Sequence, residues 1–88
     1  MIVVSPHAIK RFKERISPCS SDYEAELRIL DAYIHGTFLA QKGKQKAVKK
    51  DNIVLIIHQE GGINIIRTVE RSDFKGFWNK KKSLPKDS

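Results

Sequence analysis

The sequence has little cysteine and no long apolar run, and each shortage excludes a class of protein. Cys19 is the only cysteine among 88 residues, so no intramolecular disulfide can form and a reducing compartment is expected. The longest apolar run, Ile53–Ile57, is far too short to cross a bilayer. Met1–Val4 lacks the basic start and long apolar stretch of a signal peptide. These absences predict a cytoplasmic protein with no membrane partner.

Metal-binding and phosphate-loop motifs are also missing. His7, His35 and His58 are far apart, and no Cys/His pair has the spacing of a metal site. The sequence contains no glycine-rich phosphate loop and no G-x-S-x-G nucleophile motif. We therefore expect no metal and no other cofactor.

Positive charge is what the sequence has in excess. Seventeen Lys and Arg residues outweigh ten Asp and Glu, which gives a formal net charge of +7. This charge on a small domain favours an anionic partner, above all nucleic acid, although a basic surface that only aids solubility is the alternative. A chain of this length buries a modest core, so we expect an open face or a shallow cleft as its working surface.

Apolar periodicity, helix caps and turn residues predict one α+β domain over residues 1–79, with helices packed on a small antiparallel sheet. We expect a strand over 2–4, helices over 6–16 and 22–35, strands over 37–40, 47–48, 53–58 and 63–69, and a short last helix from 72 or 73. Ser5-Pro6 predicts the start of the first helix, Ser21 and Glu24 predict a capping box at the second, and Gly36 suits the position after it. Residues 80–88 form a basic tail that we expect to be disordered.

Two helical stripes are predicted to face the core. The stripe of the first helix consists of Ala8, Ile9, Phe12 and Ile16. The stripe of the second helix consists of Tyr23, Leu27, Leu30 and Ile34. The run 53–58 is apolar on both faces and predicts a central strand covered on both sides.

The first helix carries the first candidate site residues. His7, Arg11 and either Glu14 or Arg15 share one side, because residues three and four apart are neighbours on a helix. His7 falls in the first turn, where free N–H groups and the helix dipole favour an anion. A phosphate could bind there with His7 and Arg11 as further donors. The alternative is a solvated polar face with Lys10 and Glu14 as a surface ion pair.

The strands carry further basic candidates. Lys44, Lys46 and Lys49 can hold a phosphate backbone, or they can protect a sheet edge from aggregation. If Gly61-Gly62 forms a two-residue turn, His58 pairs with Ile65 and lies diagonal to Arg67, within reach of a shared ligand. Because an unpaired buried charge is costly, Arg67 must find an acid, reach solvent or line a site.

The segment S-P-H-A-I-K-R-F-K-E-R-I, followed by an acidic-capped helix ending in His35-Gly36 and by a central hairpin, resembles a family of small bacterial and phage domains. These begin with an H-A-x-x-R-x-x-x-R helix and are grouped by sequence with RelE/ParE-like and barnase–colicin ribonuclease toxins. The resemblance covers residues 4–69. It implies a RelE-like α+β fold and metal-independent RNA cleavage, with the motif histidine at His7 and its arginines at Arg11 and Arg15. Arg67 matches only as a basic residue on a late strand.

Three hypotheses about function follow. The first is a toxin-like, metal-independent endoribonuclease, in which His7 and His58 transfer protons, Arg11 and Arg67 hold the phosphate, and the lysines guide the backbone. The second is a small non-enzymatic inhibitor or regulator, of the kind that phages encode, which binds a host protein or nucleic-acid complex. The third is a nucleic-acid binder without catalysis. RNA is the favoured partner, and a cognate protein partner is a further prediction.

Overall fold

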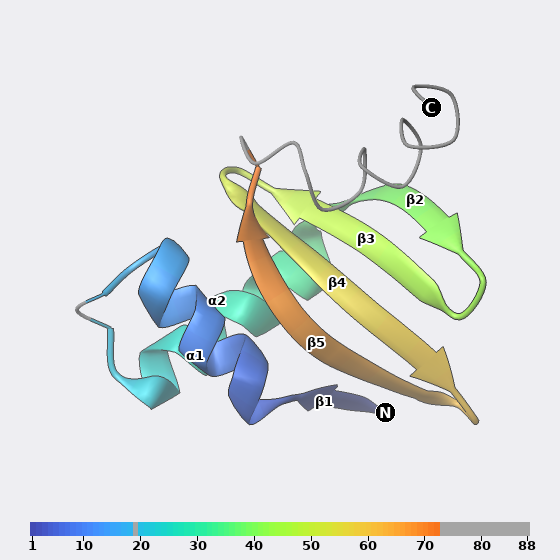
Figure 1. The fold of residues 1–88 in the computed structure, drawn as a ribbon, viewed down its shortest axis with the longest axis horizontal. Coiled ribbons are helices and arrows are strands. Elements are labelled where there is room, and N and C mark those ends of the chain that lie inside the picture. The colour runs from blue at the N-terminus through green and yellow to red at the C-terminus, as the bar shows by residue number, and fades with distance from the viewer. Residues whose placement is uncertain (19, 73–88) are drawn as a thin grey trace, which may run out of the picture.

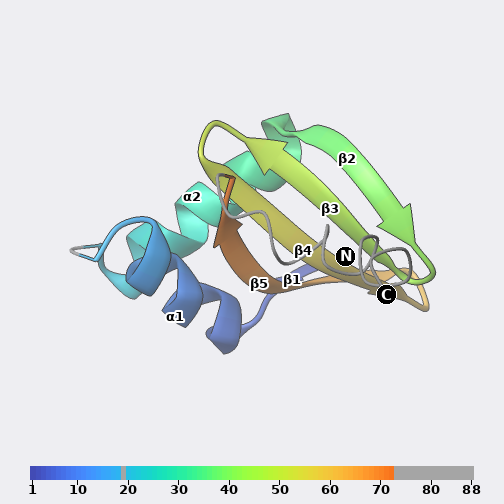
Figure 2. The ribbon, with the colours of Figure 1, turned by 45° about the horizontal axis from the view of Figure 1, so that its top comes forward.

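The computed structural model describes residues 1–18 and 20–72 (Figure 1). Within them the chain belongs to the α+β class predicted from its sequence. Helices α1 (Pro6–Arg15) and α2 (Asp22–His35) pack on one side of a five-stranded sheet, as the turned view in Figure 2 also shows. The predicted last helix and the basic tail of residues 80–88 lie outside the described residues.

The sheet is mixed rather than wholly antiparallel. Its strands are β1 (Ile2–Val4), β2 (Thr37–Lys42), β3 (Gln45–Lys50), β4 (Ile53–Glu60) and β5 (Ile63–Arg71), in the spatial order β1-β5-β4-β3-β2. Strands β2 to β5 are antiparallel neighbours as predicted, but β1 runs parallel to β5, so the antiparallel prediction is wrong for β1. Parallel neighbours need a long connection, and nearly the whole described chain supplies it here.

Both helices begin at the predicted caps. The Ser5 hydroxyl accepts a hydrogen bond from the Ala8 N–H at 3.0 Å, and Pro6, which has no N–H to satisfy, takes the first helical position. Ser21 and Glu24 satisfy each other's backbone N–H groups in a capping box, at 3.1 and 3.0 Å. The sequence signals for helix starts are therefore confirmed.

The core lies between the helices and the sheet. Its fully buried large side chains include Phe12 from α1, Ile29 from α2 and Leu55 from β4. The predicted α1 stripe is confirmed, since Ala8 and Phe12 are buried and Ile9 and Ile16 pack partly buried against them.

The predicted α2 stripe is wrong. The buried face of α2 consists of Ala25, Ile29 and Ala32, whereas Tyr23 is 71%, Leu27 48% and Ile34 65% exposed. Alanine lets a helix approach a sheet more closely than leucine does, so the face with the smaller side chains is the one that packs. Gly36 belongs to the same close contact: its φ of −79° is extended, and a Cβ there would stand 2.4 Å from the Ala32 carbonyl oxygen.

Strand β4 is covered on both faces, as its apolar run predicts. Every residue from Ile53 to Ile57 is buried. Ile53, Leu55 and Ile57 belong to the main core on the helix side, and Val54 and Ile56 join Ala47 in a smaller cluster on the opposite side.

The β4–β5 hairpin has the predicted pairing at its tip but not along its length. Glu60 pairs with Ile63 and His58 with Ile65, around the two-residue turn Gly61-Gly62. Further along, Ile57 pairs with Ile66 while Ile56 pairs with Thr68. Arg67 is therefore the extra residue of a β-bulge, which redirects its side chain relative to a regular strand.

The β2–β3 hairpin is longer than predicted. Its strands extend to Lys42 and begin again at Gln45, on either side of a turn in which Gly43 has a φ of +62°. The lysines of this region therefore lie mostly on strands, where successive side chains point to opposite faces.

Candidate functional site

A cleft of about 550 Å³ lies where α1 meets β5, and it brings together residues from both ends of the described chain. Four predicted site residues line it: His7, Arg11, Arg15 and Arg67. Its remaining lining consists of Ser5, Gln45, Ile56, Ile65, Thr68 and Glu70. Three guanidinium groups, an imidazole and two hydroxyls thus face one space.

The cleft forms because β1 is shorter than β5. β1 pairs with residues 64–66 only, so the rest of this β5 edge has no strand beside it in the described sheet. Side chains from the α1 segment take the place of the missing strand: the Ser5 hydroxyl donates to the Arg67 carbonyl at 3.2 Å, and Arg15 Nη1 donates to the Val69 carbonyl at 3.0 Å. Carbonyl groups that a longer β1 would have paired instead hold α1 along the edge.

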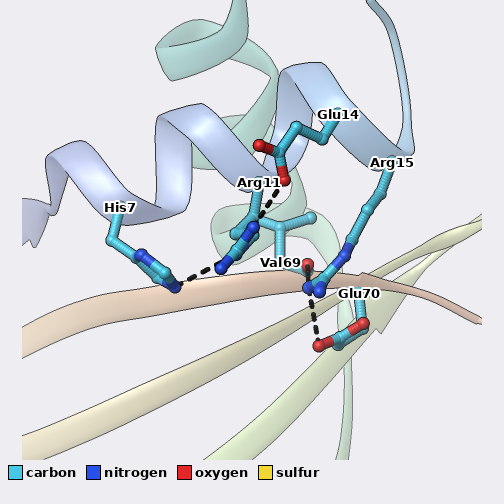
Figure 3. A network of polar contacts seen from close by, with 6 residues as sticks. All are labelled: His7, Arg11, Glu14, Arg15, Val69 and Glu70. Carbon is cyan, nitrogen blue, oxygen red and sulfur yellow. Dashed lines mark hydrogen bonds and ion pairs between the residues drawn. The ribbon is translucent and has the colours of Figure 1, made fainter.

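His7, Arg11 and Glu14 form a chain of contacts along α1 (Figure 3). Arg11 Nε donates to His7 Nε2 at 3.3 Å, and Arg11 Nη1 donates to Glu14 Oε1 at 2.6 Å. For Nε2 of His7 to accept this bond it must offer a lone pair, so the contact requires an imidazole with its hydrogen on Nδ1. The hydrogen bond from Arg11 lowers the pKa of Glu14, which remains a carboxylate. Within residues 1–18 and 20–72 no hydrogen bond of the Arg11 Nη2 is found, so Arg11 is held with the Nη2 hydrogens available to a ligand.

Arg15 has a structural partner in Glu70. Its Nη1 contacts a Glu70 carboxylate oxygen at 2.7 Å as well as the Val69 carbonyl (Figure 3). Glu70 thus pairs with Arg15 and not with Arg67, although both arginines line the cleft. Arg15 therefore lines the cleft with part of its charge already balanced, and its main effect is to hold α1 against β5.

Arg67 is the least constrained of the three arginines. Its residue is exposed at the β5 bulge, and no hydrogen bond or ion pair of its guanidinium is found within residues 1–18 and 20–72. As far as the described residues go, all five of its N–H donors are open to a ligand, and the guanidinium fork matches two phosphate oxygens.

His58 does not line the cleft. It pairs with Ile65 and with Gln45 across the strands, so its backbone is next to the lining, but its Nε2 contacts Glu60 at 3.0 Å. Its Nδ1 is buried and has no hydrogen-bond partner in the described part of the chain. The hydrogen bond from His58 lowers the pKa of Glu60. The bulge at Arg67 is what changes the diagonal His58–Arg67 relationship expected from a regular hairpin.

The three predicted lysines do not form one surface. Lys44 contacts Glu60 at 3.4 Å near the hairpin tips. Lys46 lies on the helix side, with its Nζ 5.8 Å from the centre of the Tyr33 ring. Lys49, three residues along β3, is on the opposite face and lines a separate hollow with His35. The lysines provide a diffuse positive field around the domain rather than a second binding site.

Sequence reasoning identified the charged residues of the cleft but missed its polar ones. Ser5 was interpreted only as a helix cap, yet its hydroxyl also binds β5. Gln45 and Thr68 carry no local signal, because they reach the cleft only through strand pairing. In the described residues no group of His, Cys, Asp and Glu side chains could hold a metal ion.

No helix in the described ranges is long and apolar enough to cross a membrane. Comparisons of this chain with protein-family models, with curated proteins and with solved structures find no match.

Proposed function

We propose that this protein acts on RNA, and that the α1–β5 cleft binds an RNA phosphate and cleaves the chain without a metal. The observation that supports this most directly is that His7 and Arg11, near the start of the chain, and Arg67, far along it, line one cleft. Such a set has the two capacities that RNA cleavage needs, namely a proton acceptor and cations for the phosphate.

The reaction begins with activation of the ribose. His7 is neutral in this geometry, so a 2′-hydroxyl that displaces the Arg11 Nε–H can donate its hydrogen to the His7 Nε2 lone pair. The 2′-oxygen then attacks the adjacent phosphorus and forms a 2′,3′-cyclic phosphate as the bond to the 5′-oxygen breaks. The departing 5′-oxygen takes a proton from water, which an open cleft admits.

The arginines stabilise the negative charge that develops on the phosphorane. Arg67 has its whole guanidinium available, and Arg11 keeps its Nη2 hydrogens while Glu14 holds its Nη1. Arg15 stays bound to Glu70 and keeps the two walls of the cleft in place. In this assignment Arg67 and Arg11 bind the substrate, and Arg15 positions the site.

The RelE-like resemblance agrees with this assignment at the motif residues. His7, Arg11 and Arg15 are the three motif positions, and all three line the cleft. A RelE-like arrangement, a toxin role and a cytoplasmic setting are parts of the proposal, as is His58 as a second group for proton transfer. His58 would have to leave Glu60 to take that part.

The experiment uses the full-length protein with a short RNA and with the same strand carrying one 2′-deoxy nucleotide, both in excess EDTA. We expect the wild type to cut the RNA and leave a 2′,3′-cyclic phosphate, and to leave the 2′-deoxy site intact. His7→Ala should abolish cutting while RNA binding persists. His35→Ala is the matched control, since His35 is exposed at the far end of α2.

Folded wild-type protein that binds RNA and leaves it uncut would sink the enzyme and support a nucleic-acid binder. Protein that neither binds nor cuts RNA would support the alternative of an inhibitor or regulator of a host protein. Equal loss in His7→Ala and His35→Ala would show that His7 has no special part.

A further inference from the structure

Helix α2 presents a second apolar stripe that none of the elements in residues 1–18 and 20–72 covers. Tyr23, Leu27 and Ile34 are among the most exposed large apolar side chains of the protein, and Leu30 between them is partly exposed. The face of α2 that packs on the sheet is the Ala25, Ile29 and Ala32 face. These two faces point in nearly opposite directions around the helix, so the exposed stripe faces away from the sheet.

The spacing of this stripe is that of a helix-pairing seam. Tyr23, Leu27, Leu30 and Ile34 follow one another at intervals of four, three and four residues. Large apolar residues at these intervals line up along one side of a helix and pack into the matching seam of a second helix. Isolated exposed apolar residues are ordinary, but four in this register over the length of one helix mark an interaction surface.

The charges beside the stripe show which helix fits. Three of the four positions that flank it are acidic, with Glu26 on one side and Glu24 and Asp31 on the other, and the fourth, Tyr33, packs half-buried against the core. Asp31 is already paired with Lys50 at 2.7 Å and Glu24 serves the capping box, whereas Glu26 has no ion pair within the described ranges. The chain as a whole has a net charge of +7, so this acidic border is a locally negative surface on a positively charged protein.

A second copy of the chain does not suit this border. Two α2 helices side by side in parallel would place Glu26 of one against Asp31 of the other, and in antiparallel order Glu26 against Glu26. Both arrangements bring like charges together at the rim of the seam. A helix with lysine or arginine in the flanking positions meets complementary charge instead.

We propose that the exposed α2 stripe is a docking surface for an amphipathic helix of another protein, with an apolar seam bordered by lysine or arginine. The partner packs against Leu27 and Leu30 at its centre and pairs with Glu26 at its rim. A hollow of about 440 Å³ lined by Glu24, Leu27 and Arg28, with Ser17 and Ser20, borders the stripe and offers room for a partner side chain. This surface is distinct from the α1–β5 cleft, since none of its residues lines that cleft.

The test uses two labelled peptides of about 14 residues, which fold only when bound and carry the same leucine seam. One has lysine and the other glutamate in the flanking positions. By fluorescence anisotropy with the full-length protein, we expect the lysine peptide to bind at least about tenfold more tightly than the glutamate peptide. The net charge of the protein alone predicts the opposite order, so this result identifies the acidic border.

Two variants locate the binding. Leu27→Asp should weaken binding of the lysine peptide by about tenfold or more, with an unchanged thermal unfolding midpoint because Leu27 lies outside the core. Glu26→Lys should reduce or reverse the peptide preference. Glu60→Lys makes the same charge change on the sheet face away from α2 and should leave the preference unaltered.

Equal binding of the two peptides, preference for the glutamate peptide, or no binding of either would each overturn the proposal. Analytical ultracentrifugation of the protein alone tests whether the stripe instead pairs two copies of the chain. A dimer that Leu27→Asp dissociates would assign the stripe to a second copy of the chain, and would overturn the proposed partner. None of these readouts depends on RNA cleavage, so the docking proposal and the proposed function can fail independently.

Discussion

The Ser5 hydroxyl joins the first turn of α1 to the carbonyl group of Arg67, 62 residues later. It accepts from the Ala8 N–H at 3.0 Å and donates to the Arg67 oxygen at 3.2 Å. The neighbouring Ser5 N–H donates to the Ile66 carbonyl at 3.1 Å. Ser5 therefore caps α1 and also positions the β-bulge at Arg67, the residue that is proposed to bind the RNA phosphate.

Removing this hydroxyl should affect stability and RNA binding together. We expect Ser5→Ala to lower the free energy of unfolding by about 1–2 kcal/mol, because it removes a helix cap and a hydrogen bond to the strand edge. Urea unfolding measures this loss. Ser21→Ala is the matched control, since it removes the α2 cap far from the cleft. It should lower stability similarly and leave RNA affinity unchanged; a fall in affinity for both variants would contradict the role of Ser5 at the cleft.

Arg67 should make one phosphate contact. For single-stranded RNA, each neutralised phosphate contributes about 0.7 to the slope of log affinity against log salt. We expect Arg67→Ala to weaken binding and reduce that slope by about 0.7, measured by anisotropy over a salt series. Lys10→Ala removes the same charge from a different side of α1, where it lines another hollow. If the two variants change the slope equally, Arg67 acts on RNA only through the net positive charge of the protein. It then makes no specific phosphate contact in the cleft.

Glu14 competes with a phosphate for Arg11. Its carboxylate binds Arg11 Nη1 at 2.6 Å, so Glu14→Gln should free part of the guanidinium and tighten RNA binding by a few fold. The ion pair is exposed, and its loss should change stability little. Weaker RNA binding in Glu14→Gln would mean that Glu14 positions Arg11 for the ligand.

Stability should decline in acid. Arg11 lowers the pKa of Glu14 below 4.5, Lys50 lowers that of Asp31 below 3.8, and His58, followed by Lys44, lowers that of Glu60 below 4.5. A carboxyl with a lowered folded-state pKa stabilises the fold fully above its ordinary pKa, and this contribution disappears as the pH falls through the folded value. The urea concentration at the unfolding midpoint should therefore decrease as the pH is lowered from about 5 to about 3.

Stability should also decline at high pH, and Lys50 is the group responsible. Its hydrogen bond with Asp31 raises its pKa above 10.5, so its contribution is complete below that pH and is lost as the pH rises through the raised value. The three carboxyl groups are exposed and Lys50 is only half-buried, so added salt should reduce both effects. A urea midpoint that rises on acidification would contradict the assigned ion pairs.

Gly36 is required for space rather than for an unusual backbone angle. A Cβ at this position would lie 2.4 Å from the Ala32 carbonyl and 2.5 Å from Val48 Cγ1. We expect Gly36→Ala to push α2 away from β3 and to cost about 1–3 kcal/mol in urea unfolding. Gly43→Ala is the control: it has open space but a φ of +62°, so it should cost about 1 kcal/mol through backbone strain. A smaller loss at Gly36 than at Gly43 would show that the junction can relax.

The sequence predicted what local chemistry determines. Helix starts at Ser5-Pro6 and Ser21, and the two-residue hairpin turn, depend on a few neighbouring residues and are confirmed. The buried face of α2 depends on what packs against it, and the large apolar stripe was the wrong choice because the sheet accepts the alanine face.

The cleft was only partly predictable for the same reason. The α1 spacing placed His7 and Arg11 together with either Glu14 or Arg15, and in the structure it is Arg15 that lines the cleft with them. The contribution of Arg67 depends on the β5 bulge and on the parallel pairing of β1, neither of which leaves a local pattern in the sequence. A one-residue shift in a strand changes which face a side chain reaches.

The pairing of the first strand with the last one has a consequence for synthesis. The Met1 amino group reaches the Gly62 carbonyl at 3.3 Å, and Ser5 reaches Arg67, so the cleft side of α1 is held by residues made near the end of the described chain. Contacts this distant in sequence close late in folding. On a translating ribosome the helix that carries His7 can form early, but the cleft is assembled only after β5 has emerged. A nascent chain surrounded by RNA would thus carry an unassembled site until most of it had been made.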